Sequence, residues 1–229
     1  MGSPRQAGRG LVELVGPAGA GKSTIARLLR QRDPTLRAAP GLWSLPRAPL
    51  HLNTVRLLPR VLRFYRAFPP PVWAEIKQII RLDTLYRVVG RSRTPAVLDE
   101  GPVLALGWFA VYGDARMRRP GFASWHAQAV AQWGAALGVV MLLDASDAVL
   151  VERIRGREQR HGMKRKSDAE IAAFVQAYRT ALAGAVAALG RVNGLAVWRI
   201  DTSIEAPEAS TERVLAALRR GEGEGADGH

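Results

Sequence analysis

The chain has 229 residues, of which 48% are hydrophobic and none is cysteine, and it carries a net charge of +13 at pH 7. This length and content suit one α/β domain, and a chain without cysteine has no disulfide or thiolate metal site, which fits a cytoplasmic protein. With neither a run of about 18 uncharged apolar residues nor an export signal, we expect no transmembrane segment. The charge attracts anions, but no nucleic-acid-binding motif accompanies it, so we expect no dedicated nucleic-acid reader.

Four apolar runs bounded by chain-breaking residues predict buried parallel strands, at 11–15, 96–99, 139–144 and 196–200. Helical stretches rich in Ala, Leu and Arg separate them, at 72–90, 124–137, 147–158, 168–190 and 207–219. Because strands alternate with helices, we expect a doubly wound parallel α/β sheet flanked by helices, with ligands at the carboxyl ends of the strands. Residues 1–9 and 219–229 are polar and Gly-rich and are predicted to be disordered, which leaves 10–218 as one domain.

The first predicted strand opens directly into a G-x-x-x-x-G-K-S sequence at 16–23. Its glycines permit tight turns and let backbone N–H groups close on phosphate oxygens, and the following helix directs its positive N-terminus at them. Lys22 would reach the β- and γ-phosphates of a nucleotide, and the Ser23 hydroxyl would bind Mg²⁺. The predicted nucleotide-binding residues are Gly16, Ala18, Gly19, Ala20, Gly21, Lys22, Ser23 and Thr24. The alternative is a Gly-rich turn before an ordinary helix.

Acidic residues follow two of the predicted strands. Asp99 and Glu100 end the strand at 96–99, where a carboxylate beside the phosphates can hold Mg²⁺ or accept a proton from an attacking hydroxyl. We expect Asp99 on the metal side and leave open which of the two is the base. Asp144, at the end of the strand 139–144, is a second candidate, although the residues just after it suit a helix N-cap.

The segment at 40–73 is interrupted by prolines, and it contains a basic amphipathic stretch at 54–67. Such a helix can be an ordinary surface helix whose Arg stems cover the core, can line an acceptor site, or can rest on an anionic membrane. The sequence leaves these three interpretations open.

Seven cationic side chains fall within 153–166, where like charges such as Arg153 and Arg157 repel one another along a helix. Bound anions remove that repulsion. The cluster therefore predicts an arginine-bearing lid that closes over the transferring phosphoryl group, with a solvated charge run as the alternative.

The order of these parts over 10–218 resembles the thymidylate kinase and deoxynucleoside kinase superfamily. The resemblance rests on the P-loop, a strand ending in an acidic residue, the sequence Leu-Asp-Ala-Ser-Asp, an Arg-x-x-x-Arg helix and a last strand ending in Asp-Thr-Ser. It implies a P-loop nucleotide-kinase fold that uses ATP and Mg²⁺, with an acceptor region at about 40–95 and a lid at about 153–166. Asp99 falls on the family's acid, and Glu100 falls where the family has an arginine.

The resemblance also implies roles for further residues. Arg153 and Arg157 fall on the lid arginines, and the loop at 201–203 (Asp201, Thr202 and Ser203) falls on the lining of the adenine pocket. Arg81 lies roughly where thymidylate kinases have an arginine that grips the acceptor, and Arg87 is an equal candidate.

These observations predict an ATP-dependent kinase that moves the γ-phosphoryl group to a hydroxyl or phosphate oxygen of a nucleoside-like or other small acceptor. Its predicted catalytic residues are Lys22, Asp99, Glu100, Arg153 and Arg157. One alternative is an ATPase that couples hydrolysis to a conformational change, since 96–100 also resembles a Walker B strand. Another is a nucleotide-binding adaptor at an anionic surface. A homodimer is compatible with the sequence.

Overall fold

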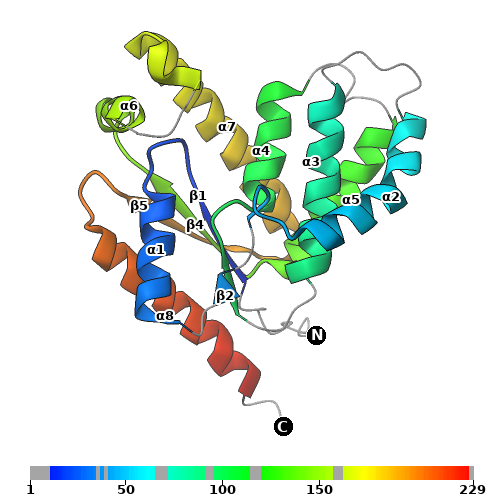
Figure 1. Ribbon diagram of the computed structural model, residues 1–229. Coiled ribbons are helices and arrows are strands. Elements are labelled where there is room, and N and C mark those ends of the chain that lie inside the picture. The colour runs from blue at the N-terminus through cyan, green and yellow to red at the C-terminus, as the bar shows by residue number, and fades with distance from the viewer. Residues whose placement is uncertain are drawn as a thin grey trace.

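The computed structural model of the chain describes residues 11–34, 37–38, 41–64, 72–90, 95–113, 120–156 and 162–226. At its centre is a five-stranded sheet in the order β2-β3-β1-β4-β5, in which every neighbouring pair is parallel (Figure 1). The strands are β1 (Leu11–Val15), β2 (Arg37–Ala38), β3 (Ala96–Leu98), β4 (Val139–Asp144) and β5 (Ala196–Asp201). The predicted doubly wound parallel α/β sheet is confirmed.

Eight α-helices of the described residues flank the sheet. They are α1 (Lys22–Arg32), α2 (Arg47–Phe64), α3 (Val72–Leu85), α4 (Pro102–Tyr112), α5 (Pro120–Ala136), α6 (Asp147–Gly156), α7 (Asp168–Asn193) and α8 (Pro207–Ala226). A π-helical turn, Tyr86–Gly90, continues α3, and a short 3₁₀ helix, Gly162–Arg165, precedes α7. A capping box between Ser167 and Glu170 starts α7, and Gly194 with φ 61° ends it.

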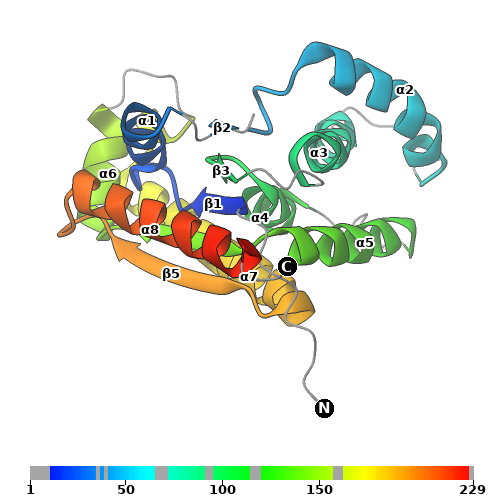
Figure 2. The same cartoon turned by 90° about the horizontal axis from the view of Figure 1, so that it is seen from below.

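Alternate side chains of β1 divide the core into two parts, as the period of a strand requires. Leu11 and Val15 pack in one cluster with residues of α4, α5 and α7, and Val12 and Leu14 pack in the other with residues of α1 and α8. Figure 2 shows α1, α6 and α8 together on one side and α2 to α5 on the other. Because both faces are covered, β1 is buried along its whole length.

The sheet order places the loop after β1 at a switch point. In the sheet, β2 and β3 lie on one side of β1, and β4 and β5 lie on the other. The connections therefore diverge at the carboxyl end of β1 and leave a crevice there, which is where open α/β sheets bind ligands. The ends of β3 and β5 lie along the same edge.

The helix α7 is, by length and composition, the one helix of the described residues that would suffice to cross a membrane. Only 28% of its most apolar window is buried. In this structure it packs against α4, α5 and α6, which is also how an apolar helix flanks the sheet of an α/β domain.

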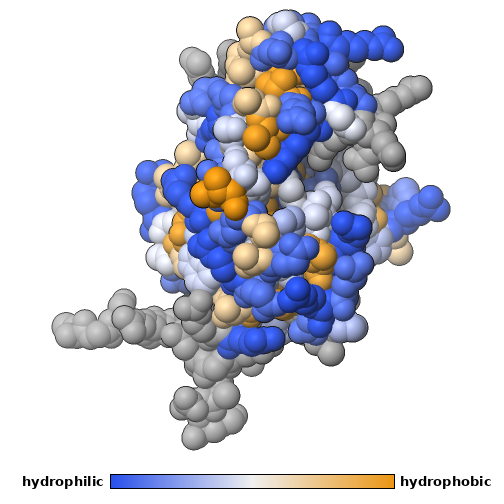
Figure 3. All heavy atoms as spheres, turned by 90° about the vertical axis from the view of Figure 1, so that its left-hand side faces the viewer, coloured by the Kyte–Doolittle hydropathy of each residue, from blue (hydrophilic) through white to orange (hydrophobic). Residues whose placement is uncertain are grey.

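The strand predictions at 11–15 and 139–144 are confirmed, but two elements were missed and one strand was misjudged. The missed elements are β2, which has two residues, and α4, which is apolar on all sides and so has no helical periodicity. The strand at 196–200 was expected to be buried, yet β5 is an edge strand in which Ile200 alone is buried. Figure 3 shows the face on the side of α6, β5 and α8 as mostly hydrophilic, with scattered apolar patches.

Helix ends also differ from the predictions. The last helix was expected to end at 219 before a disordered tail, but α8 continues to Ala226, because a running helix tolerates isolated glycines at about 1 kcal/mol each. The predicted helix at 54–67 begins earlier, at Arg47, and residues 65–67 lie outside the described residues, as do residues 1–9.

Candidate functional site

The loop after β1 has the backbone of a phosphate cradle. Gly19 and Gly21 have φ of 88° and 87°, a region that residues with a Cβ rarely adopt. At Gly16 a Cβ would lie 2.1 Å from the carbonyl oxygen of Leu143, so only glycine lets the loop cross β4 this closely. The three glycines are therefore required by the loop's shape, which an ordinary turn before a helix would not need.

The N-terminus of α1 is open to an anion. Within the described residues, no side chain caps it and no acidic residue stands in its first turn, so its first N–H groups face the loop without a carboxylate to bind them. The Lys22 ammonium donates to the carbonyl oxygens of Gly16 at 2.7 Å and of Pro17 at 2.9 Å, which holds its charge at the loop. Amides, helix dipole and ammonium together fit the phosphates of a nucleotide.

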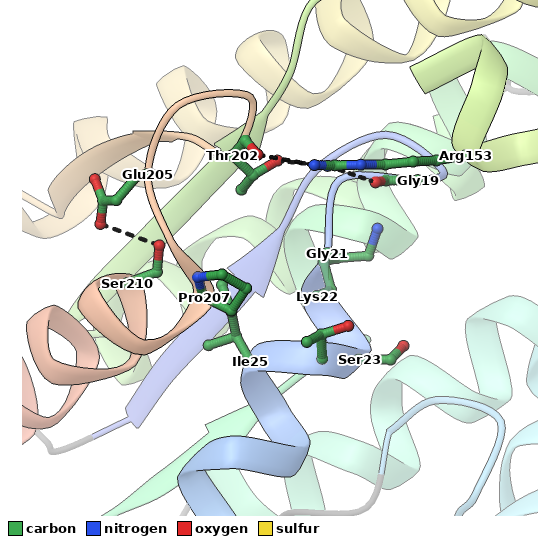
Figure 4. A pocket seen from close by; sticks show the side chains of 11 residues that line it. Gly19, Gly21, Lys22, Ser23, Ile25, Arg153, Thr202, Glu205, Pro207 and Ser210 are labelled. Atoms are coloured by element: carbon green, nitrogen blue, oxygen red, sulfur yellow. Dashed lines mark hydrogen bonds between the residues drawn. The ribbon is translucent and has the colours of Figure 1, made fainter. Parts of the chain in front are cut away.

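Arg153 of α6 joins this loop to the segment after β5 (Figure 4). Its guanidinium donates to the carbonyl oxygen of Gly19 at 3.3 Å, and to the hydroxyl and the carbonyl oxygen of Thr202 at 2.9 and 2.8 Å. The Thr202 hydroxyl in turn donates to the carbonyl oxygen of Asp144 at 2.9 Å. The first predicted lid arginine thus lies directly over the P-loop, and Arg157 lies outside the described residues.

A cavity of 320 Å³ opens between the P-loop and the start of α8, within the size range of small-molecule sites. It is lined by Gly19, Gly21, Lys22, Ser23, Thr24, Ile25, Arg153, Thr202, Glu205, Pro207 and Ser210. Of the predicted loop 201–203, Thr202 alone is among these residues. The Asp201 carboxylate accepts from the N–H of Ser203 in the same loop, and the Ser203 hydroxyl accepts from the N–H of Ser146 in the loop between β4 and α6.

The carboxylates of Asp99 and Glu100 lie together after β3. A Cβ at Gly41 would lie 3.1 Å from an oxygen of each, so both carboxylates reach the same glycine. Burial raises the pKa of Glu100, the negative charge of Asp99 raises it further, and Lys22 and Arg81 oppose the shift. Lys22 therefore acts electrostatically on Glu100 as well as on the P-loop.

The two candidate acceptor arginines have different surroundings. The Arg81 guanidinium lies 4.2 Å from the ring centroid of Trp43, and burial lowers its pKa against the attraction of Glu100. Arg87 instead donates to Asp83 at 2.6 Å, and Asp83 also accepts from Asn53 of α2 at 3.0 Å. The structure thus brings Arg81 close to Glu100. It places Arg87 at the contact between α3 and α2, and α2 is the helix that carries the predicted amphipathic stretch.

Sequence reasoning missed Glu13, a fully buried carboxylate in β1. It accepts from the N–H groups of Gly101, Val103 and Leu104 at 3.1, 3.0 and 3.2 Å, and so caps the N-terminus of α4 directly after Asp99 and Glu100. Burial raises its pKa to about 7 in spite of these three hydrogen bonds. The signal was a single charged residue inside an otherwise apolar strand, Leu-Val-Glu-Leu-Val.

Asp144 has a structural partner. Both of its carboxylate oxygens accept from the guanidinium of Arg179 on α7, at 2.9 and 3.1 Å, and Arg179 also donates to Asp147 and to the carbonyl oxygen of Ala145. This network ties α7 to the loop between β4 and α6. Of the two open interpretations for this strand end, the geometry favours a structural one.

Two further cations of the predicted lid pair with acidic residues of α7. Arg155 pairs with Asp168, and Lys166 with Glu170. Within the described residues, no three His, Cys, Asp or Glu side chains are grouped to hold a metal. An Mg²⁺ ion bound with a nucleotide would need fewer, because phosphate oxygens and water supply most of its ligands. Ser23 and Asp99 stay the predicted candidates for that role.

Comparisons with known proteins agree with this fold. No family model and no curated protein matches the chain. A deoxyadenosine kinase from M. mycoides with dCMP and a flexible dCDP bound is similar over 91% of this chain and 98% of its own, at a TM-score of 0.53 and 15% identity. The same enzyme with dCTP gives 0.51 and 13% over the same shares. At these identities the likeness shows the fold alone, that of a deoxynucleoside kinase-like P-loop kinase.

The raised pKa of Glu13 predicts a pH-dependent stability. In the unfolded chain Glu13 ionises near pH 4.5, whereas in the folded chain it keeps its proton to about pH 7. The folded state therefore binds the extra proton in this window, and the free energy of unfolding falls by up to about 3 kcal/mol as pH rises through it. Glu13→Gln, which does not titrate, should lack this fall in denaturant unfolding measured from pH 4.5 to 8.

Glu152→Gln, an exposed glutamate of α6, is the matched control and should follow the wild type. A constant difference in unfolding free energy between wild type and Glu13→Gln at every pH would contradict the prediction.

Proposed function

We propose that the chain is an ATP-dependent kinase that transfers the γ-phosphoryl group to a hydroxyl group of a small acceptor. The observation that carries this proposal is the position of Lys22, which holds the P-loop through Gly16 and Pro17 and at the same time acts on Glu100. Phosphoryl transfer needs a phosphate cradle and an acidic group near the acceptor, and the Lys22 ammonium acts on both the P-loop and Glu100.

Each half has a separate role. The loop amides and Lys22 would position the β- and γ-phosphates, while Ser23 and Asp99 would hold Mg²⁺, which supplies charge neutralisation when bound. Glu100 is the candidate base, because a raised pKa brings a carboxylate closer to the pKa that proton transfer at neutral pH favours. Arg153, and by the resemblance Arg157, would stabilise charge on the transferring group.

The charges near the acceptor favour a neutral or cationic hydroxylated molecule, such as a nucleoside, a sugar or an antibiotic, over a monophosphate. Arg81 is stacked on Trp43 and faces Glu100, so its charge is already offset. Asp99 and Glu100 add two carboxylates at the same place. Among the described residues, Lys22 and Arg81 are the cations that act on Glu100, so a phosphate acceptor would meet this pair with that charge already in use.

An ATPase that drives a conformational change is the second candidate, because Asp99 and Glu100 also suit a metal ligand followed by a water-activating acid. The two differ in the destination of the phosphoryl group, which is either an organic hydroxyl or water.

The test is ADP release from ATP with and without a panel of nucleosides, nucleotides, sugars and aminoglycoside-like acceptors. A kinase should release ADP many-fold faster with one acceptor class, and Lys22→Ala should slow this at least about 100-fold while leaving the fold intact, because the ammonium neutralises phosphate charge and carries no part of the core. Acceptor-independent ADP release would favour the ATPase. Turnover by Lys22→Ala within a few-fold of wild type would remove the P-loop from the chemistry.

The two carboxylates should be separable by mutation. Asp99→Asn should change the Mg²⁺ dependence of turnover, as expected for a metal contact, whereas Glu100→Gln should lower kcat with nearly unchanged nucleotide binding, as expected for a base. Mg²⁺ titrations of initial rate, alongside equilibrium nucleotide binding, distinguish these effects. Mild and equal losses in both variants would exclude this loop from catalysis.

Arg153 should contribute to the transition state more than to ground-state binding. Arg153→Ala is expected to lower kcat by roughly 10³-fold with a smaller change in ATP affinity, and Arg153→Lys should restore little because an ammonium lacks the planar fork. Arg155→Ala is the control, since Arg155 pairs with Asp168. If Arg153→Ala instead weakens ATP binding at unchanged kcat, Arg153 is only a wall of the cavity.

A further inference from the structure

The outer face of α2 is apolar. The side chains at its centre are four, three and four residues apart in sequence, so they share one line along the helix, which we call the outer stripe. They are Ala48, Leu52, Val55 and Pro59, and all four are exposed. Leu52 and Val55 are each 75% exposed. A surface helix usually presents polar residues on this side, so the outer stripe is a candidate contact surface.

The rotation of α2 about its own axis is fixed from the opposite side. The buried Asn53 donates to the hydroxyl of Thr84 at 2.8 Å and to the carboxylate of Asp83 at 3.0 Å, both on α3. Leu57 and Leu58 pack against the apolar cluster that α3 forms with α4 and α5. Figure 2 shows α2 outside α3, at the edge of the molecule. The packing of the inner face therefore turns the outer stripe to the surroundings.

The charges beside the outer stripe are positive. By helical spacing, the exposed Arg56 lies along one flank, and the exposed Arg47 and His51 lie along the other. The sequence has no acidic residue from 34 to 74, so α2 itself carries no negative charge. An apolar line flanked by cations is the pattern of a helix that lies in the plane of an anionic membrane surface.

Other partners fit this combination less well. A second copy of the chain would bring the same arginines toward one another, in a protein whose net charge is already +13. Nucleic acid would attract the arginines, but its phosphates offer nothing to the Leu52 and Val55 side chains. A lipid surface provides for both, because anionic headgroups meet the cations and the acyl boundary receives the apolar side chains.

We propose that the outer stripe of α2 docks the chain onto the surface of an anionic lipid bilayer. Leu52 and Val55 enter the headgroup region, and Arg47 and Arg56 pair with lipid phosphates. The helix lies on the membrane and does not cross it. The proposal is independent of the proposed function, because it uses no residue of the P-loop or of the acidic pair. It selects one of the three interpretations that the sequence leaves open for this helix.

The experiment is co-sedimentation of the full chain with lipid vesicles. One set is pure phosphatidylcholine, and the other contains about 30% phosphatidylglycerol as the anionic lipid. Wild type should bind the anionic vesicles at least about 10-fold more tightly, and the affinity should fall as salt is raised from about 0.1 to 0.5 M because salt screens the arginines. The double variant Leu52→Ser, Val55→Ser should bind them at least about 10-fold more weakly than wild type.

The variants have matched controls on the other side of the molecule, where α1 and α8 lie (Figure 2). Ile204→Ser removes an apolar side chain that is 86% exposed just before α8, and it should leave vesicle binding unchanged. Arg56→Ala should weaken binding to anionic vesicles about fivefold, whereas Arg30→Ala, at an exposed position of α1, should change it less than about twofold. Since Leu52 and Val55 are both largely exposed, the double variant should keep the unfolding temperature of wild type.

Three results would overturn the proposal. The first is a wild type that shows no preference for anionic vesicles. The second is a double variant that binds as tightly as wild type, or an equal loss in Arg30→Ala and Arg56→Ala, because the net charge alone would then explain adsorption. The third is a wild type that ignores vesicles but self-associates in sedimentation, with a monomeric double variant, because the outer stripe would then be a contact between copies of the chain.

Discussion

The buried carboxylate of Glu13 connects the two halves of the candidate site. It lies in β1, two residues before the strand ends and three before Gly16, and it accepts three backbone N–H groups at the start of α4. Those N–H groups follow directly after Asp99 and Glu100. Fixing α4 to β1 therefore also fixes the distance between the phosphate cradle and the acidic pair, and a Cβ at Gly101 would meet the Glu13 carboxyl carbon at 2.7 Å. Ionisation of a fully buried group is costly, and the α4 N-terminus offsets that cost only in part, so the pKa of Glu13 is still raised to about 7.

Around this connection, the proposed function divides the site into a nucleotide side and an acceptor side. Arg153 and Thr202 bound the first, where the cavity runs toward α8. Trp43 and Arg81 bound the second, beside the carboxylates. The Lys22 ammonium donates to the P-loop and acts electrostatically on Glu100, so in the proposed function it stands where donor and acceptor would meet. Arg179, farther along the chain, has a structural role instead, because it ties α7 to the end of β4 through Asp144.

What the sequence predicted well is what depends on neighbouring residues. The P-loop, with its glycines, its lysine and its helix, is a local pattern, and the alternation of strands and helices is enough to predict the doubly wound sheet.

Contacts between residues distant in sequence could not be predicted. Nothing near Glu13 in the sequence indicates that it meets residues 101–104. Arg87 and Arg81 were equal candidates in the sequence, and only the packing of α2, which brings Asn53 to Asp83, distinguishes them. Local patterns also fail for elements without periodicity, such as α4, and for loops without a motif, such as the one that carries Glu205. The roles of the candidate site residues stay predictions, and Arg157 lies outside the described residues.

The central claim is that nucleotide and acceptor occupy opposite sides of Lys22 at one edge of the sheet. A crystal structure of the chain with Mg²⁺ and a non-hydrolysable ATP analogue tests it most directly. The account predicts the triphosphate against the loop 16–24, its terminal phosphate between Lys22 and the Asp99–Glu100 pair, and the base in the cavity between Thr202 and Pro207. A triphosphate bound away from this loop, or a base lying on the Trp43 side, would contradict it.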